Sequence, residues 1–222
     1  MATVEDKMAA EVAKLNAERD LALIEKMSAE ERLIMARLRR VEAERLAAVE
    51  AAKDERNGIY QFSGQVTESS IRLCQNRLIE WDRLFPDRDI RITLMSGGGE
   101  IVHGVALYDF IQTMKRPSRR IVITALGLAA SMASVLLQAG DWRVMGREAW
   151  LMLHEASLFA EGKTSDVSAR LDWVKAVQER MLDIYASRSR MTKAAIRAKW
   201  GKDWFIDSKE ALAKGFVDEV VG

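Results

Sequence analysis

The chain has 222 residues, which is enough for one ordinary domain or for one domain with a long appendage. Its apolar fraction of 49% supports a sizeable core and excludes wholesale disorder. The 34 basic residues nearly balance the 33 acidic ones, so nucleic-acid binding through bulk charge is disfavoured. One cysteine, Cys74, excludes an internal disulfide framework, and two histidines, His103 and His154, leave little for a metal centre. No metal or other cofactor is expected.

The N-terminus carries acids at Glu5 and Asp6 and has no apolar core, so it does not resemble a secretory signal. The uncharged stretch 121–140 is long enough to span a membrane. Gly127 interrupts it, however, and small residues follow, which indicates a buried strand that leads into a buried helix. We therefore expect no membrane segment and a cytoplasmic protein.

Residues 1–57 contain neither Gly nor Pro and are rich in good helix formers. Apolar residues recur there in alternating steps of three and four, at Ile24, Met27, Ile34, Leu38, Val41 and Ala48. Because Glu31 and Arg45 occupy the same stripe, a long amphipathic helix that packs on another surface is favoured over a dedicated coiled coil. Asn57-Gly58 is the first turn, and it divides this extension from a second domain over 58–222.

The second domain shows strand and helix patterns in alternation. Strands are expected at 59–62, 90–94, 121–126 and 150–154. Helices are expected at 69–85, 101–114, 131–139 and 164–188, with a last short unit over 208–221. Pro86 and Pro117 end two of these helices. Strands that alternate with helices predict an α/β fold in layers.

Ser131 lies where a buried strand turns into a helix, among the small residues of Gly127-Leu128-Ala129-Ala130-Ser131-Met132-Ala133. A serine in such a turn is exposed at the positive end of the helix dipole, as nucleophilic serines require. A serine at the start of a helix is equally often a simple N-cap. The turn by itself leaves both interpretations open.

His154 ends the apolar strand Leu151-Met152-Leu153, at a sheet edge where loops build functional sites. A lone histidine is more often structural than catalytic. His103, at the opening of a helix, is a rival base, although its neighbours indicate a structural role.

Three glycines follow the strand 90–94 in the loop Ser96-Gly97-Gly98-Gly99. Without Cβ atoms, such a loop can turn its N–H groups toward a phosphate or toward the oxyanion of a tetrahedral intermediate. It lacks the Gly-Lys-Ser/Thr ending of a P-loop and the spacing of a dinucleotide-binding motif, so a nucleotide is disfavoured. The glycine loop, the serine turn and the strand-end histidine indicate more together than each does alone.

The run from Ile59 to Val221 resembles the proteolytic subunit of the Clp protease (ClpP), a serine peptidase of the ClpP/crotonase superfamily. The matching motifs agree in order and spacing. They are Gly64-Gln65-Val66, Asp89 to Gly99, Gly104 with Tyr108-Asp109, Ala129-Ala130-Ser131-Met132-Ala133, Met152-Leu153-His154, Asp203-Trp204-Phe205, Glu210-Ala211 and Gly215-Phe216-Val217-Asp218. The resemblance implies a spiral fold of repeated β-β-α units, here with a long N-terminal helical extension.

The resemblance implies a role for each matching residue. Ser131 would be the nucleophile, His154 the general base and Asp203 the acid that orients it. The N–H groups of Gly99 and Met132 would form the oxyanion hole. Gly98, Gly99 and Glu100 would bind the substrate, a peptide or an unfolded protein.

The resemblance also implies a homo-oligomeric ring, stacked in pairs in some relatives, and allows an AAA+ unfoldase as a partner. Some motifs depart from the family pattern: Gly97 replaces a proline, Glu155-Ala156 replaces Gln-Pro, and Trp204 replaces an arginine that helps contacts between rings. Two alternatives remain open. One is a phage-type protease that matures capsid or scaffold proteins without an ATPase. The other is a catalytically silent assembly protein on the same fold. A crotonase-type acyl-CoA enzyme is disfavoured because it needs no Ser-His-Asp set.

Overall fold

The computed structural model describes residues 8, 10, 11, 14, 31, 33–42, 58–157 and 161–222. The chain divides into two compact units, Met1–Asp54 and Glu55–Gly222. The described residues of the first unit are helical and exposed to solvent. The rest of the helix expected over 1–57, and the coiled coil weighed for it, lie outside the described residues. None of the helices that the structure describes is long and apolar enough to cross a membrane.

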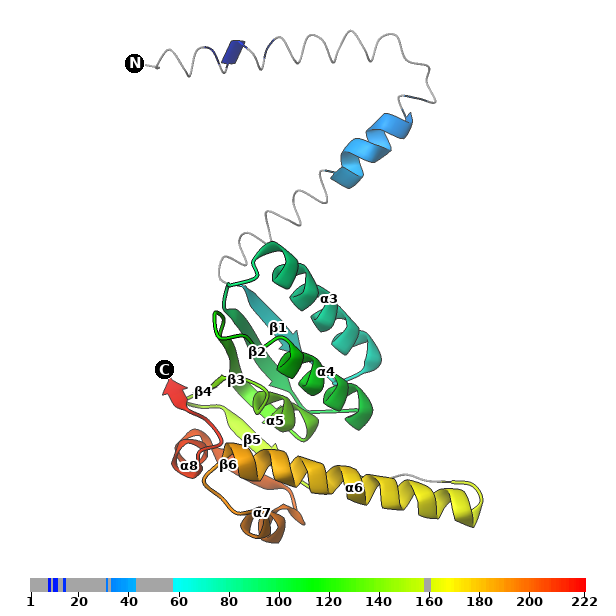
Figure 1. Cartoon of the computed structure of the whole chain (residues 1–222), viewed down its shortest axis with the longest axis vertical. Helices are drawn as coiled ribbons and strands as arrows, with labels where there is room; N and C mark the ends of the chain where they lie inside the picture. The colour runs from blue at the N-terminus through cyan, green and yellow to red at the C-terminus, as the bar shows by residue number, and fades with distance from the viewer. Residues whose placement is uncertain are drawn as a thin grey trace. The chain divides into compact units, whose positions relative to one another are not determined.

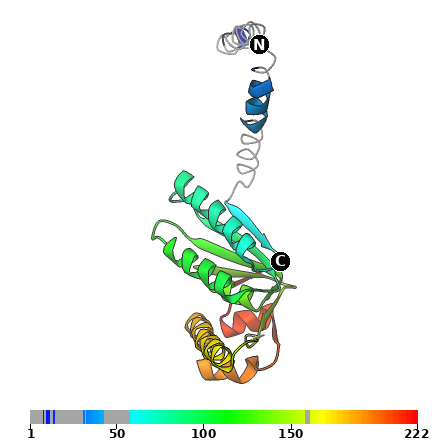
Figure 2. The same ribbon diagram turned by 90° about the vertical axis from the view of Figure 1, so that its right-hand side faces the viewer.

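The second unit is an α/β fold, as the sequence predicts, built on a mainly parallel sheet (Figure 1). Five strands lie side by side and parallel in the order β1 (Ile59–Ser63), β2 (Ile90–Ser96), β3 (Ile121–Ala130), β4 (Trp142–Gly146) and β7 (Glu219–Val221). The helices are α3 (Glu68–Leu84), α4 (Ile101–Thr113), α5 (Met132–Leu137), α6 (Thr164–Arg188), α7 (Lys193–Trp200) and α8 (Ser208–Lys214). Figure 2 shows α3 and α4 along one face of the sheet.

The alternating pattern of β2 shows how the sheet is packed. Ile90, Ile92 and Leu94 are buried, whereas Arg91 and Met95 between and after them are exposed. Because successive side chains of a strand point to opposite faces, one face of the sheet packs in the core and the other faces solvent.

Helix α3 begins where the sequence provides a cap. The side chain of Thr67 accepts a hydrogen bond from the Ser70 N–H, and the Ser70 hydroxyl accepts one from the Thr67 N–H. This reciprocal pair satisfies two N–H groups that the helix itself cannot. The buried side chains of α3 recur at helical spacing, at Ile71, Cys74, Leu78 and Trp81.

Strand β3 is longer than predicted, because it continues through Gly127 to Ala130 instead of ending at 126. Its first part pairs with β4, from Val122 onward, and its last part, Leu128 to Ala130, pairs with β5 (Trp150–Leu153). Gly127 lies between the two parts with φ of +65°, a conformation that favours glycine. The glycine therefore marks a change of partner strand, and the helix expected at 131–139 is the shorter α5.

Strand β5 also pairs with β6 (Trp204–Asp207), in the one antiparallel arrangement of the described sheet. Leu151, Leu153 and Ile206 are buried, whereas Trp150 and Phe205 are exposed. The sequence patterns did not predict β4, β6 or α7. Strands β4 and β6 each pair with a strand that is distant in the chain, β7 and β5 respectively.

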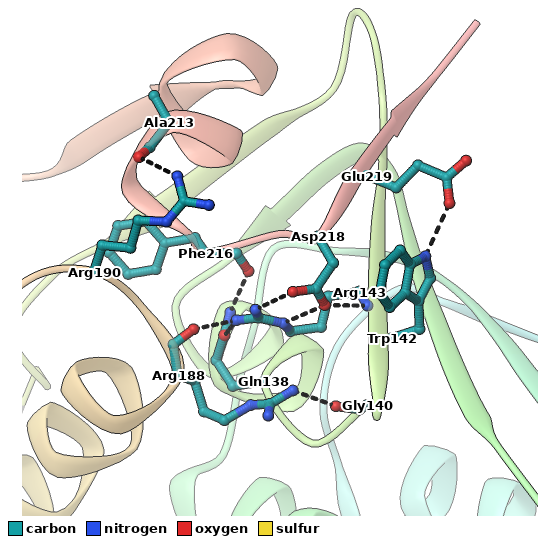
Figure 3. A network of polar contacts seen from close by, with 10 residues as sticks. All are labelled: Gln138, Gly140, Trp142, Arg143, Arg188, Arg190, Ala213, Phe216, Asp218 and Glu219. Carbon is teal, nitrogen blue, oxygen red and sulfur yellow. Dashed lines mark hydrogen bonds and ion pairs between the residues drawn. The ribbon is translucent and has the colours of Figure 1, made fainter.

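An ion-pair network joins β4 to the segment before β7 (Figure 3). The Arg143 guanidinium donates to both carboxylate oxygens of Asp218, from Nε at 2.9 Å and from Nη2 at 2.6 Å. Its Nη1 donates to Gln138 Oε1 at 2.7 Å and also to the Arg188 carbonyl. Arg188 in turn donates to the Gly140 carbonyl at 2.6 Å. The network therefore ties α5, β4 and the end of α6 to the C-terminal segment.

Candidate active site

Ser131 occupies the sharp turn between β3 and α5. Its φ of 53° and ψ of −125° make it the one non-glycine residue with positive φ in the described part of the chain. Strained backbone of this kind is typical of functional sites, including the turns that present nucleophilic serines. The Ser131 N–H donates to the Met152 carbonyl at 2.8 Å, which holds the turn against β5. Ser131 is at the N-cap position of α5, but its side chain makes no capping hydrogen bond.

The Ser131 hydroxyl contacts His154 instead. Ala130 pairs with Met152 in the parallel register of β3 and β5, so the residues just beyond these two strand ends lie side by side. His154 Nε2 lies 2.7 Å from Ser131 Oγ, within hydrogen-bonding distance. The rival histidine, His103, contacts Glu100 instead: its Nε2 is 3.2 Å from Oε2 of Glu100, the N-cap residue of α4.

Asp203 is brought to His154 by the register of β5 and β6. Leu153 pairs with Trp204 in this antiparallel ladder, so His154 and Asp203 are the next residues on each side. Asp203 Oδ1 lies 3.3 Å from His154 Nδ1. The Asp203 side chain is 61% exposed, so water screens the interaction more than it would in a buried pair.

The glycine loop passes directly beside the serine turn. Gly98 and Gly99 have φ of 94° and 149°, and a Cβ added at Gly98 would lie 2.6 Å from Ser131 Cβ. The Val66–Gly99 bridge uses the Gly98 carbonyl and the Glu100 N–H, so it leaves the Gly99 N–H without a backbone acceptor among the described residues. The Met132 N–H is the first of α5, and the first N–H groups of a helix have no partner within it. Two N–H groups are thus available near Ser131.

A pocket of about 410 Å³ opens beside the glycine loop. Gly99 and Glu100 form part of its wall, and Trp173 and Val174 of α6 form another part. Glu100 is 60% exposed, so its carboxylate stays hydrated next to this pocket. The remaining lining residues are Gln65, Val66, Thr67, Ile101, Val102 and Ser157.

Three residues near the site were not identified as functional from the sequence. Gly104 belongs to a family motif but was given no role, and Ser134 and Tyr185 belong to no motif. A Cβ at Gly104 would lie 2.1 Å from Met132 Cγ, so this glycine gives the Met132 side chain room to pack against α4. Ser134 and Tyr185 are buried behind the serine turn, and their hydroxyl oxygens lie 2.6 Å apart. They are separated by 51 positions, and no sequence motif joins them.

The described residues contain no group of three or more His, Cys, Asp or Glu side chains that could hold a metal ion. Cys74 is buried, and burial raises the pKa of its thiol to about 12, so it remains a protonated thiol at neutral pH.

The fold and this group of side chains define a class: an α/β protein with a serine, a histidine and an aspartate at the ends of paired strands. The sequence model of the Clp protease family matches residues 41–222. The ATP-dependent Clp protease proteolytic subunit of Deinococcus radiodurans is 30% identical over 163 residues, which covers 72% of this chain and 78% of that protein. The chain therefore belongs to the Clp protease family, a family of peptidases, as its sequence motifs predict.

Proposed function

We propose that this protein is a serine endopeptidase in which Ser131 is the nucleophile, His154 the general base and Asp203 the orienting acid. The 2.7 Å distance between His154 Nε2 and Ser131 Oγ is the observation that carries the proposal, because a serine becomes a nucleophile only beside a base that takes its proton. Membership of the Clp protease family supports the same reaction class.

The reaction then follows the usual course of acyl transfer. As Ser131 Oγ attacks the carbonyl carbon of a substrate peptide bond, its proton moves to His154 Nε2. His154 next donates this proton to the leaving amine, and an ester to Ser131 remains. Water, deprotonated by His154, hydrolyses the ester and regenerates the serine. Asp203 near His154 Nδ1 favours the tautomer that can accept at Nε2.

The oxyanion of the two tetrahedral intermediates would be bound by the N–H groups of Gly99 and Met132. Loss of one such donor typically slows a reaction by ~10²- to 10³-fold. The glycines are needed here because any Cβ at Gly98 would collide with Ser131. The substrate chain would lie along Gly98, Gly99 and Glu100, with one side chain in the pocket between this loop and α6.

A serine-reactive fluorophosphonate tests the proposal directly. We expect the wild-type protein to be labelled at Ser131, as identified by peptide mass spectrometry, and the Ser131→Ala variant to remain unlabelled. The Ser208→Ala variant, which removes a buried serine hydroxyl outside the site, is the matched control and should still be labelled. Labelling of the Ser131→Ala variant at the wild-type level would exclude Ser131 as the nucleophile. An unlabelled wild-type protein would instead favour the catalytically silent assembly protein.

We also propose that the peptidase is a homo-oligomeric ring whose subunits contact one another through the open face of the sheet. Exposed large apolar side chains gather on the strands there, and monomers seldom expose such a group. They are Met95, Leu126, Trp142, Trp150, Phe205 and Val221, each 38% to 52% exposed. A closed ring needs the same two complementary surfaces on every copy.

Replacing Leu126 by glutamate is expected to shift the assembly toward smaller species. Leu126 is 41% exposed on β3, and a carboxylate there would lose its hydration in an interface without gaining a partner. Sedimentation velocity measures the change. Leu73→Glu is the control, because Leu73 is 65% exposed on α3, away from the strands. Equal sedimentation of the Leu126→Glu variant and the wild type would contradict this interface.

We also propose how the strands correspond to the repeated β-β-α units that the family resemblance implies. Val66 follows β1 and Gly99 follows β2, and these two residues form a parallel bridge, while the second part of β3 turns to β5. We assign these segments as the short second strands of the β-β-α units expected for a spiral fold.

A further inference from the structure

The peptide group between Ser131 and Met132 can take part in hydrogen bonds on both sides, through its N–H and through its carbonyl oxygen. Its N–H is one of the two proposed oxyanion donors. Its carbonyl oxygen, on the Ser131 side, accepts hydrogen bonds from the Ser134 N–H at 3.0 Å and from the Ser134 hydroxyl at 2.7 Å. Because the peptide group is planar, whatever fixes this carbonyl also fixes the direction of the N–H.

The Ser134 hydroxyl also contacts the Tyr185 hydroxyl, and the directions of its two hydrogen bonds can be deduced. A carbonyl oxygen can only accept, so the single Ser134 proton is used in the bond to Ser131. The contact of 2.6 Å between Ser134 Oγ and Tyr185 Oη must then be donated by the tyrosine. Burial raises the pKa of Tyr185 well above its ordinary value, against the opposing effect of Ser134, so the phenol keeps its proton.

Tyr185 is itself held in place by the core. Its side chain is 1% exposed, and its ring makes edge-on contacts with Trp200 at 6.4 Å and with Phe216 at 6.2 Å between centroids. Ser134 is likewise 1% exposed. A chain of hydrogen bonds therefore runs from a fixed aromatic residue of α6, through α5, to the strained peptide group of the serine turn.

We propose that Ser134 and Tyr185 are positioning residues that aim and polarise the Met132 N–H toward the oxyanion; this inference rests on the proposed peptidase function. Hydrogen bonds donated to a carbonyl draw electron density toward its oxygen and make the N–H of the same peptide group a stronger donor. The chain also opposes relaxation of the strained backbone at Ser131. Neither residue touches the substrate, so both act only through this peptide group.

Removal of either hydroxyl is expected to reduce the enzyme's stabilisation of the transition state more than its affinity for the substrate. We expect Ser134→Ala and Tyr185→Phe to lower kcat per active site by about 3- to 30-fold, a fraction of the loss that follows removal of an entire oxyanion donor. KM should change little, because the oxyanion forms only after substrate has bound. The double variant should be no slower than Ser134→Ala within about twofold, because Tyr185 acts through Ser134.

The experiment measures kcat and KM with a fluorogenic peptide, after titration of active sites with the fluorophosphonate. The affinity for a peptide boronic acid, which forms a tetrahedral adduct with serine, should fall in parallel with kcat. Two controls match the chemical changes elsewhere in the unit. Ser208→Ala removes a buried hydroxyl that donates to the Arg147 carbonyl at 2.6 Å, and Tyr108→Phe removes a half-buried phenol on α4. Both should keep the wild-type kcat.

The possible results separate this inference from the proposed function. If the wild-type protein is not labelled at Ser131, the peptidase assignment fails and the inference fails with it. If the wild type is labelled but Ser134→Ala and Tyr185→Phe keep its kcat and its boronate affinity, only the inference is overturned. The same holds if the two variants merely unfold at lower temperature, with unchanged kcat for each titrated site, or if KM changes alone.

Discussion

Replacing His154 by alanine is expected to lower kcat for peptide hydrolysis by about 10⁴- to 10⁶-fold, with KM nearly unchanged. His154 Nε2 is 2.7 Å from the Ser131 hydroxyl, and no second histidine of the described chain approaches that oxygen. Without the base, the serine stays protonated at neutral pH, and the remaining rate comes from substrate binding and the oxyanion donors. Steady-state kinetics with a fluorogenic peptide, together with the rate of fluorophosphonate labelling, measures the loss.

The only other histidine of the chain provides the control for this prediction. His103→Ala removes an imidazole that pairs with Glu100 at 3.2 Å beside the proposed substrate loop, so it should alter KM more than kcat. Asp203→Asn should lower kcat less than His154→Ala does, because the carboxylate only orients the base and is 61% exposed. A His154→Ala variant that retains more than about a tenth of the wild-type kcat would rule out His154 as the general base.

The second large effect concerns stability. Replacing Asp218 by alanine is expected to lower the free energy of unfolding by about 3–5 kcal/mol, because it leaves the buried Arg143 guanidinium without the carboxylate that balances its charge. The Arg143 side chain is 6% exposed and the Asp218 side chain 24% exposed. Chemical denaturation followed by circular dichroism measures the change. The neighbouring Glu219→Ala, which removes an exposed carboxylate bonded to the Trp142 ring nitrogen at 2.8 Å, should cost less than about 1 kcal/mol.

The pH dependence of this effect has a defined sign. Burial raises the pKa of Asp218, but the hydrogen bonds and the charge of Arg143 outweigh it and hold the pKa below its ordinary value. The stabilisation is therefore fully present above the unfolded-state pKa of about 4 and is lost as the pH falls through the lower folded-state value. The difference between wild type and an Asp218→Asn variant should accordingly shrink in acid. A difference that stays constant from about pH 7 to pH 3 would contradict the ion pair as its cause.

The sequence predicted the parts of the fold whose patterns are local. The alternation at Ile90, Ile92 and Leu94 identified β2, and the helical pattern over 69–85, ended by Pro86, identified α3. Strand β4 was missed because it carries Arg143 in a buried position, and this arginine is compatible with burial only through Asp218, 75 residues later. No local pattern can reveal such a partner.

The residues of the candidate site likewise divide into those with a local sequence pattern and those without one. Ser131 and His154 could be named as candidates from the sequence because each follows an apolar strand, at a sheet edge where loops often build functional sites. Asp203 could be selected only by resemblance to a family, because its strand, β6, is four residues long and half exposed. The Ser134–Tyr185 contact joins α5 to α6 and depends on how these two helices pack. Sequence spacing contains no information about that packing.

The change of partner along β3 has a consequence for how this site can diversify. Ser131, His154 and Asp203 each stand one residue beyond a main-chain pair, Ala130 with Met152 or Leu153 with Trp204. Their mutual distances therefore depend on ladder hydrogen bonds between backbone groups, which form whatever the side chains are, rather than on contacts among neighbouring side chains. Residues around the pocket can therefore vary without changing these distances, while a one-residue insertion in β5 would move His154 out of register with Ser131.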